Sequence, residues 1–219
     1  MNVFDIIGPI MVGPSSSHTA GAVRIGGMVR RILGEPPQNA IIRLHGSFAQ
    51  TYQGHGTDRA LIGGLLGFAP DDLRIKDSFT FAQEAGFQYQ FIPENLGHVH
   101  PNTALITVEG ISGKQVEVMG CSVGGGNILI NRVNGVDVEF NGQYYTLIIP
   151  HQDTPGAVAA VTTILAHRQI NIARMHLYRA HRGGEATMIL ETDQKVNSEL
   201  IGFIQSLPGI TNVTMIEPI

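Results

Sequence analysis

The chain has 219 residues, which is enough for one large domain or two small ones and excludes a bare peptide or a disordered tail. Its 14 Lys and Arg residues against 18 Asp and Glu residues give a net charge of −4, so it lacks the basic surface that nucleic-acid binding requires. Charged residues make up only 15% of the chain against a usual ~25%, which predicts surface that is buried against another subunit.

A single cysteine, Cys121, excludes an internal disulfide, a CxxC redox pair, a cysteine-rich zinc site and an iron–sulfur cluster held by this chain alone. We expect Cys121 to be a small buried hydrophobe rather than a nucleophile. The first residues carry no export signal, and the apolar stretches fall far short of the ~20 residues that span a bilayer. A cytoplasmic protein with no membrane or nucleic-acid partner is therefore expected, and any cluster has to come from another chain.

Hydrophobic periodicity predicts an α+β domain over residues 1–141. Its expected elements are, in chain order, an amphipathic helix behind Ser15–Ser17 that ends near Gly34, a strand at 39–47, a helix from Asp58 onward, a short strand at 73–75, a short helix at 79–86, and strands at 88–92, 102–108, 114–119 and 127–133. The Asn134-Gly135 and Asn141-Gly142 pairs predict tight turns between the later strands.

Residues 145–219 predict a second domain with the order β-α-β-β-α-β, the ferredoxin-like arrangement. Strands are expected at 145–149, 170–180, 186–192 and 209–217, and helices from the segment Asp153-Thr-Pro-Gly156 to about residue 165 and at 198–207. The loop with Asp153 and Gly156 is a candidate binding site for the amino or carboxylate group of a small ligand, and Asn171 is a candidate residue beside that site. A well-capped helix explains the same residues equally well, so both interpretations stay open.

The most informative motif is Gly13-Pro-Ser-Ser-Ser-His-Thr19, which places hydroxyls, a histidine and free backbone N–H groups at a helix N-terminus. Such an end binds anions, for example a carboxylate or a phosphate. A second motif, Gly54-His-Gly-Thr-Asp58, places another histidine at another helix start. A serine-rich cap with a solvated histidine is the plain alternative, but two such sites in one chain are harder to dismiss.

His18 and His55 are expected to remain neutral near neutral pH, because the positive end of a helix disfavours an imidazolium. A neutral imidazole can act as a base. If the two helix ends converge, the cleft would hold an anionic ligand by its carboxylate while an imidazole reaches an acidic proton beside it.

Weaker signals come from other histidines and from a glycine run. His98 and His100 would share one face of a strand as a candidate metal pair, but no third ligand is evident and a solvated loop is the commoner case. The segment Gly124-Gly-Gly-Asn127 could let a ligand approach the backbone or could be a turn, and it lacks the spacing of a nucleotide-binding motif. No role is assigned to His45, His167, His176 and His181.

Together these motifs resemble the β chain of bacterial iron–sulfur L-serine dehydratases. The matching segments are Gly13-Pro-Ser-Ser-Ser-His-Thr-Ala-Gly21, Gly46-Ser-Phe-Ala-Gln-Thr-Tyr-Gln-Gly-His-Gly-Thr-Asp58, His100-Pro-Asn-Thr103 and Gly124-Gly-Gly-Asn127. The resemblance implies that residues 1–141 form an allosteric-substrate-binding-type α+β domain, also found in some 3-phosphoglycerate dehydrogenases. It implies that residues 145–219 form an ACT domain, a small amino-acid-sensing module.

The resemblance also implies an activity. In this family a separate α chain carries a [4Fe–4S] cluster, and the complex converts L-serine to pyruvate and ammonia, with an open iron as Lewis acid on the hydroxyl group and a base that takes the α-proton. His18 and His55 would face that cluster, one as the base and one as a partner of the carboxylate or the hydroxyl. Which of them is the base stays open, and a monovalent cation is a further candidate cofactor.

The resemblance assigns further residues and partners. The substrate would be held by Ser15, Ser16, Ser17, Thr19, Gly56, Thr57, Asn102, Gly125 and Asn127, and the ligand of the ACT domain by Asp153, Gly156 and Asn171. The implied partners are the α chain, L-serine and a second copy bound through the ACT domain. The alternative is a non-catalytic module that senses an amino acid or hydroxy acid. The histidine pair favours catalysis, because arginine or backbone groups would suffice for passive carboxylate capture.

Overall fold

The computed structural model describes residues 13–179 and 181–219, which fall into two compact units. The first unit ends at Gly135, and the second runs from Val136 to Pro218. Two expectations rest on residues outside the described ranges: the lack of an export signal, read from residues 1–12, and the end of the strand predicted at 170–180, which is Ala180.

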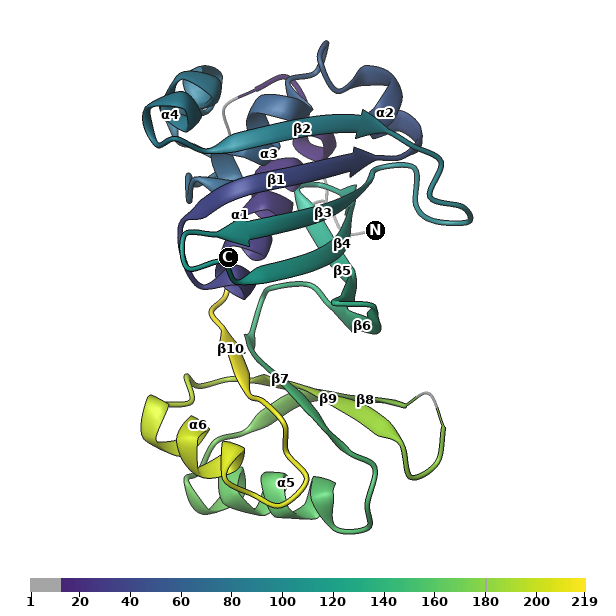
Figure 1. Ribbon diagram of the computed structural model, residues 1–219, viewed down its shortest axis with the longest axis vertical. Helices are drawn as coiled ribbons and strands as arrows, with labels where there is room; N and C mark the ends of the chain where they lie inside the picture. Colours follow the sequence, from purple (N-terminus) through teal and green to yellow (C-terminus); the bar gives the residue numbers. More distant parts are fainter. Residues whose placement is uncertain (1–12, 180) are drawn as a thin grey trace. The chain divides into compact units, whose positions relative to one another are not determined.

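The first unit combines a mixed sheet with helices. Its helical elements are the π-helical turn η2 (Ser16–Ala20), α1 (Gly21–Leu33), α2 (Gly46–Thr51), α3 (Thr57–Leu65), the 3₁₀ turn η3 (Leu73–Asp77) and α4 (Ser78–Glu84). Its strands are β1 (Pro37–Leu44), β2 (Gln88–Pro93), β3 (Thr103–Gly110), β4 (Gln115–Gly124) and β5 (Asn127–Val133). The sheet order is β2-β1-β3-β4-β5-β6, in which the last strand, β6 (Val136–Phe140), is the first element of the second unit. β1 pairs with β2 in parallel, whereas β1–β3, β3–β4 and β4–β5 are antiparallel. Helices α1 and α3 lie together on one face of this sheet (Figure 1).

One end of the sheet gathers the sequence motifs. The registers place Leu44 beside Pro93 and Ala104, Thr103 beside Cys121, and Gly124 beside Asn127. The last residues of β1, β2 and β4 therefore share this end with the first residues of β3 and β5. The motifs Gly46–Asp58, His100–Thr103 and Gly124–Asn127 occupy the segments that enter or leave these strands.

Helices α1 and α3 approach each other closely because glycines lie where they meet. A Cβ atom at Gly64 would lie 2.1 Å from the carbonyl oxygen of Val23, and one at Gly26 would lie 2.4 Å from that of Leu61. The apolar stripe expected on the first helix is buried beneath this contact: Ile25, Met28, Val29 and Ile32. The backbone-to-backbone packing fixes the helix ends that carry both histidine motifs.

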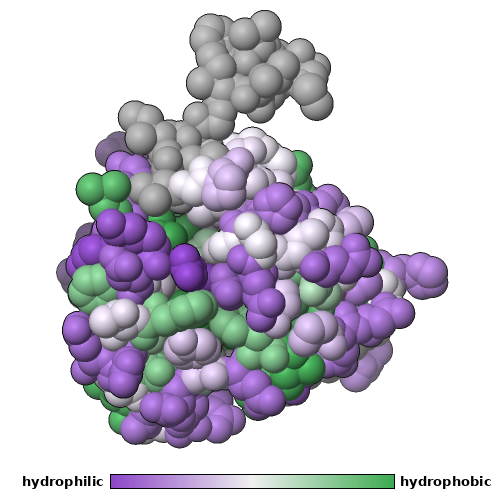
Figure 2. Space-filling view, turned by 90° about the horizontal axis from the view of Figure 1, so that it is seen from above, coloured by the Kyte–Doolittle hydropathy of each residue, from purple (hydrophilic) through white to green (hydrophobic). Residues whose placement is uncertain are grey.

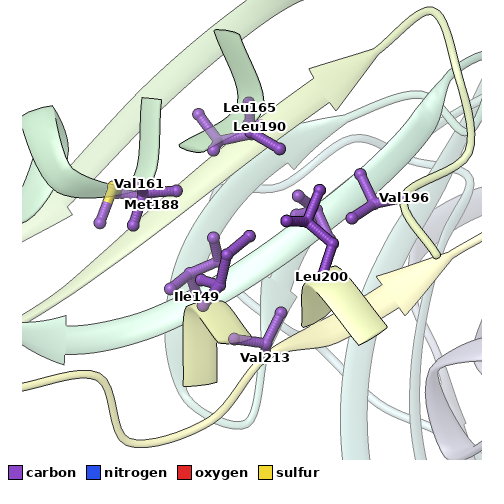
Figure 3. Close-up of a cluster of buried hydrophobic side chains, with 10 residues drawn as sticks. Ile149, Val161, Leu165, Met188, Leu190, Val196, Leu200 and Val213 are labelled. Carbon is purple, nitrogen blue, oxygen red and sulfur yellow. The ribbon is translucent and has the colours of Figure 1, made fainter. Parts of the chain in front are cut away.

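The second unit has the ferredoxin-like order that the sequence predicts. Its elements are β7 (Tyr145–Gln152), α5 (Ala157–His167), β8 (Ile172–Arg179), β9 (Glu185–Thr192), α6 (Ser198–Gln205) and β10 (Thr214–Ile216). The antiparallel sheet has the order β10-β7-β9-β8. Side chains from the sheet and both helices form one buried core (Figure 3), which includes Ile149, Val161, Leu165, Leu190 and Leu200. The α+β fold class is thereby confirmed.

Several expected elements are different in the structure. The strand predicted at 73–75 is wrong, because the segment is the turn η3, capped by the Asp72 carboxylate on the Arg74 N–H at 2.9 Å. The helix α2 was not predicted; it begins at Gly46, whose φ of 56° turns the chain sharply after β1. The closing strand is only Thr214–Ile216, shorter than the predicted 209–217.

No helix in the described ranges is long and apolar enough to cross a membrane. On the face shown in Figure 2, hydrophobic residues form small areas that hydrophilic residues separate. A scattered distribution of this kind is normal for the surface of a globular protein.

A buried carboxylate, Glu191, lies in β9. Its side chain is 1% exposed, and neither oxygen has a hydrogen-bond partner among the described residues. Arg174 of the neighbouring β8 lies 3.7 Å away, with half of its own side chain exposed. Burial raises the pKa of Glu191, although the charges of Arg174 and His176 act in the opposite direction.

We expect Glu191→Gln to increase the free energy of unfolding at pH 8, on the order of 1 kcal/mol, because it removes a poorly compensated buried charge. A raised carboxyl pKa in the folded state favours folding at low pH and loses that contribution as pH rises, so the difference should vanish near pH 4. Urea unfolding at both pH values measures it. The exposed Glu185→Gln on the same strand is the control. A loss of stability at pH 8 on Glu191→Gln would contradict the prediction.

Candidate active site

The serine-rich motif forms a π-helical turn that runs directly into α1. Ser15 is the cap of η2, and its Oγ accepts a hydrogen bond from the backbone N–H of His18 at 3.2 Å. Ser15 Oγ also lies 3.3 Å from Ser17 Oγ. π-Helical turns are rare and are frequently found at functional sites. The predicted cap is therefore present, and it projects His18 from a wide turn instead of a regular α-helix.

His18 is held on both of its ring nitrogens. Nδ1 lies 3.0 Å from Ser17 Oγ, and Nε2 lies 3.0 Å from Ser47 Oγ. The buried Phe48 ring and the imidazole are in a T-shaped contact, with the centroids 5.3 Å apart. Burial lowers the pKa of His18, and the neighbouring His55 lowers it further. The lowered pKa has the direction that the expected neutral His18 requires, but its causes are burial and the neighbouring His55 rather than the helix end from which the neutral state was predicted.

The second histidine motif meets the first. The rings of His55 and His18 lie 4.9 Å apart between centroids, tilted by 40°. His55 is exposed and precedes Gly56, the α3 cap with a φ of 70°. The buried Thr19 hydroxyl donates to the His55 carbonyl at 3.4 Å, which ties the two motifs together. The structure thus brings the starts of the two helices together, which the sequence alone could not establish.

Ser47 is the residue that sequence reasoning missed. It lies in α2 directly after Gly46, where a Cβ atom would come within 2.7 Å of the Pro101 carbonyl oxygen, so that the turn requires glycine. The Phe48 N–H donates to the same carbonyl at 3.4 Å. Ser47 stood at the end of the strand predicted at 39–47, which in the structure ends at Leu44, and inside the Gly46–Asp58 segment that carries the family resemblance. Neither signal indicated which side chain Ser47 would contact.

The remaining predicted substrate residues line the same end of the sheet. The N–H of Asn102 donates to His100 Nδ1 at 3.1 Å, and the carbonyl of Asn102 accepts from the Ser122 N–H at 3.0 Å. The buried Ser122 side chain packs on Gly21, at the start of α1. Asn102 is therefore linked to the helix that follows the serine motif.

The β4–β5 turn is built from glycines. Gly124, Gly125 and Gly126 have φ values of 100°, 60° and 77°. Arg24 of α1 donates from a guanidinium nitrogen to the Gly126 carbonyl at 2.9 Å, which anchors the turn to the helix. Asn127 is exposed where β5 begins. The turn interpretation of this segment is confirmed, and a ligand contact there stays a prediction.

Two predicted substrate residues are inside the protein. Thr19 is 2% exposed and Thr57 is 0% exposed. The hydroxyl of Thr19 donates a hydrogen bond to the His55 carbonyl. Thr57 Oγ1 has no hydrogen-bond partner among the described residues. Because Thr19 is buried behind the two histidines, the geometry favours a supporting role for it over contact with a substrate. Ser15, Ser16 and Ser17 are partly accessible and can contact a substrate.

The candidate regulatory loop is ordered by its own contacts. The Asp153 carboxylate accepts from the Gly183 N–H and from Arg179, each at 3.0 Å, and these bonds hold the pKa of Asp153 below its usual range. Gly156 caps α5 with a φ of 93°, and a Cβ atom there would meet nothing within 4 Å. The loop has open space beside it.

Asn171 does not lie beside that loop. It precedes Ile172, which pairs with Thr192 at one end of the sheet, whereas Asp153 bonds Arg179 at the other end of β8. Its side chain donates to Asp193 Oδ2 at 2.7 Å. The prediction that Asn171 lies beside the Asp153–Gly156 loop of the same chain is therefore wrong. The two lie at opposite ends of β8.

The residues of this chain do not fit an iron–sulfur cluster, which takes about four thiolate ligands. Cys121 is buried in β4 as predicted, its Sγ donates to Asn131 Oδ1 at 3.4 Å, and burial raises its pKa. Among the residues that the structure describes, no group of three His, Cys, Asp or Glu side chains could hold a metal ion. His98 and His100 lie in a loop and not on a strand.

Comparison with known proteins gives consistent matches. Residues 2–90 match the family described as "Serine dehydratase beta chain", and residues 145–209 match "ACT domain". The chain is 44% identical to the "Probable L-serine dehydratase, beta chain" of Bacillus subtilis (strain 168), over 98% of this chain and 97% of the relative. It is 39% identical to the "L-serine dehydratase, beta chain" of Peptoniphilus asaccharolyticus, over 99% and 98% of the two chains.

A more distant match links the chain to a different enzyme. The "D-3-phosphoglycerate dehydrogenase" of Bacillus subtilis (strain 168) is 26% identical over 90% of this chain, and the match covers 37% of that enzyme. The shared region is therefore a part of that larger chain.

Proposed function

Because the chain belongs to the L-serine dehydratase beta-chain family, we propose that it forms one part of an enzyme that converts L-serine to pyruvate and ammonia. The observation that carries the proposal is the pair of imidazoles at 4.9 Å, one held by hydroxyls on both nitrogens and one exposed. Such a pair can exchange protons with a bound substrate, which a passive carboxylate site does not require.

The active site is completed by a second chain. This chain has one cysteine, which is buried, so a [4Fe–4S] cluster has to be carried by an α chain. The low share of charged residues supports a partner, because charged residues are depleted in the cores of interfaces. L-Serine would then bind between the two chains, at the end of the sheet where His55 is exposed.

The first unit binds the substrate carboxylate near the serine motif. The first N–H groups of a helical turn lack intrahelical partners and attract anions, and η2 continues into α1 without a break. We assign the substrate carboxylate to Ser15, Ser16 and Ser17. The remaining residues assigned to substrate binding form the wall of the substrate pocket: Gly56, Asn102, Gly125 and Asn127. Thr19 supports His55 through its hydrogen bond to the His55 carbonyl. Thr57, whose buried hydroxyl has no hydrogen-bond partner among the described residues, is assigned no role.

Anaerobic co-expression with the candidate α chain tests the proposal. Pyruvate formation from L-serine is measured for each chain alone and for the mixture. We expect turnover only in the mixture. Full turnover by the α chain alone would make this protein a regulator, with its anion sites used for sensing.

The ACT domain regulates the enzyme and pairs with a second copy. β8 is the outermost strand of its sheet, so no strand of that sheet pairs with its outer edge among the described residues. Met175 and Leu177 on this strand are 48% and 45% exposed. An edge strand with exposed apolar side chains fits a symmetric contact with the same strand of another copy.

We expect Gly156→Val to change the response of turnover to added amino acids or to change the oligomeric state. A β-branched residue at a φ of 93° costs about 1–3 kcal/mol, so the loop before α5 has to move. Enzyme assays with added amino acids and light scattering measure the two effects. Gly202→Val is the control, because Gly202 has open space and ordinary helical geometry in α6. An unchanged response together with an unchanged oligomer would remove the loop from regulation.

A further inference from the structure

We propose that Ser47 is a catalytic residue through which His18 exchanges a proton with the substrate. The inference rests on the proposed function and adds to it a residue and a proton path. Both ring nitrogens of His18 are already engaged by hydroxyl groups, Nδ1 by Ser17 and Nε2 by Ser47, each at 3.0 Å. A substrate atom therefore cannot reach either nitrogen without displacing one of these hydroxyls.

The two hydroxyls differ in their surroundings. Ser17 Oγ has a second neighbour, Ser15 Oγ at 3.3 Å, and Ser15 Oγ already accepts the His18 N–H. On the Nδ1 side of the ring, the hydroxyl of Ser17 therefore bonds only to groups of the same helical turn, η2 and its cap. Ser47 is half-buried, and its hydroxyl bonds the imidazole across 29 positions of the chain. A hydroxyl donates one hydrogen bond and accepts up to two, so Ser47 can bind His18 and a substrate at once.

Ser47 is held rigidly enough to act in this way. Gly46 is packed on the Pro101 carbonyl, where no Cβ atom fits. The Thr51 hydroxyl donates to the Ser47 carbonyl at 2.7 Å, within the short helix α2. Phe48, the next residue, is fully buried and forms a T-shaped contact with the imidazole. The hydroxyl and the ring are thereby fixed from both sides, as a proton relay requires.

The relay has a balanced proton path. The Ser47 hydroxyl takes the α-proton of the substrate while its own proton passes to Nε2 of neutral His18. The electron pair of the broken C–H bond stays on the substrate carbon. The relay requires the tautomer in which Nδ1 carries the ring proton and donates it to Ser17 Oγ, so that Nε2 is free to accept from Ser47. His18 thereby gains a positive charge that the two hydroxyl oxygens stabilise by accepting its N–H groups.

A double-mutant cycle in the complex of both chains tests the relay. We expect Ser47→Ala to lower kcat for pyruvate formation by roughly 10²-fold or more, with a smaller change in KM. His18→Ala should cost a similar factor, and the double variant no more than either alone, because both changes break one path. Ser47→Thr keeps the hydroxyl and should recover most of the rate. Gln50→Ala, an exposed change on the same helix, is the control.

A second measurement does not depend on turnover. Nitrogen NMR of the full chain reports the protonation of the His18 ring, and Ser47→Ala should shift the Nε2 resonance whereas Gln50→Ala should not. An unshifted resonance, a Ser47→Ala enzyme with wild-type kcat, or additive losses in the double variant would each overturn the relay. A wild-type complex without serine turnover would refute the proposed function, and with it the assignment of the relay to serine chemistry.

Discussion

Replacing His55 by alanine is expected to abolish measurable pyruvate formation by the complex while leaving the two chains assembled. His55 is exposed beside the half-buried His18 ring and is the imidazole at this site with direct access to a bound substrate. Loss of a positioned acid–base group or of its carboxylate contact costs about 10²–10⁴-fold in rate. Steady-state assays on the purified complex measure the change, and size-exclusion chromatography confirms that both chains are present.

The matched control is His98→Ala, which removes an exposed histidine from the loop between β2 and β3. It should turn over serine at the wild-type rate. Normal turnover by the His55→Ala complex would contradict a catalytic role for the histidine pair and would favour the sensing alternative.

Gly64→Ala is expected to destabilise the first unit by roughly 3 kcal/mol, near the upper end of the range for overpacking. The added Cβ atom would lie 2.1 Å from the Val23 carbonyl oxygen and 2.7 Å from the Gly27 nitrogen, so the backbones of α1 and α3 have to separate. Thermal or urea unfolding measures the loss. Serine turnover should fall as well, because the same helices set the distance between the two histidine motifs.

Gly27→Ala provides the comparison on the facing helix. A Cβ atom there would have its nearest neighbour at 4.0 Å, and alanine favours a helix more than glycine by ~1 kcal/mol. This variant should be as stable as the wild type or more stable. Equal stability of Gly64→Ala and Gly27→Ala would show that close helix contact does not hold the unit together.

The sequence predicted those parts of the fold that depend on local patterns. The stripe Ile25, Met28, Val29 and Ile32 repeats with the helical period and is buried as expected. A helix follows the Asp153–Gly156 segment as predicted, but it begins at Ala157, after Gly156 with a φ of 93°, and no side chain caps it. The cap expected from Asp153 is wrong, because its carboxylate accepts from Gly183 and Arg179 instead. The segment at 73–75 was mistaken for a strand because three residues are too few to show a period, and the Asp72 cap decided its conformation.

The site was predictable in its residues and not in its contacts. The two histidine motifs could be found because each combines cap residues with an imidazole. The contact between His18 and Ser47 depends on how a turn after β1 meets the start of α1, which no local pattern records. The separation of Asn171 from Asp153 likewise follows from the direction of β8 in its sheet.

Under the proposed function, this chain supplies half of a shared active site. The most direct test is an anaerobic titration, in which increasing amounts of this chain are added to a fixed amount of the α chain and pyruvate formation from L-serine is followed. The rate should be near zero without this chain, rise linearly, and stop rising at an equimolar ratio. A full rate from the α chain alone, unchanged by the addition, would contradict a shared site.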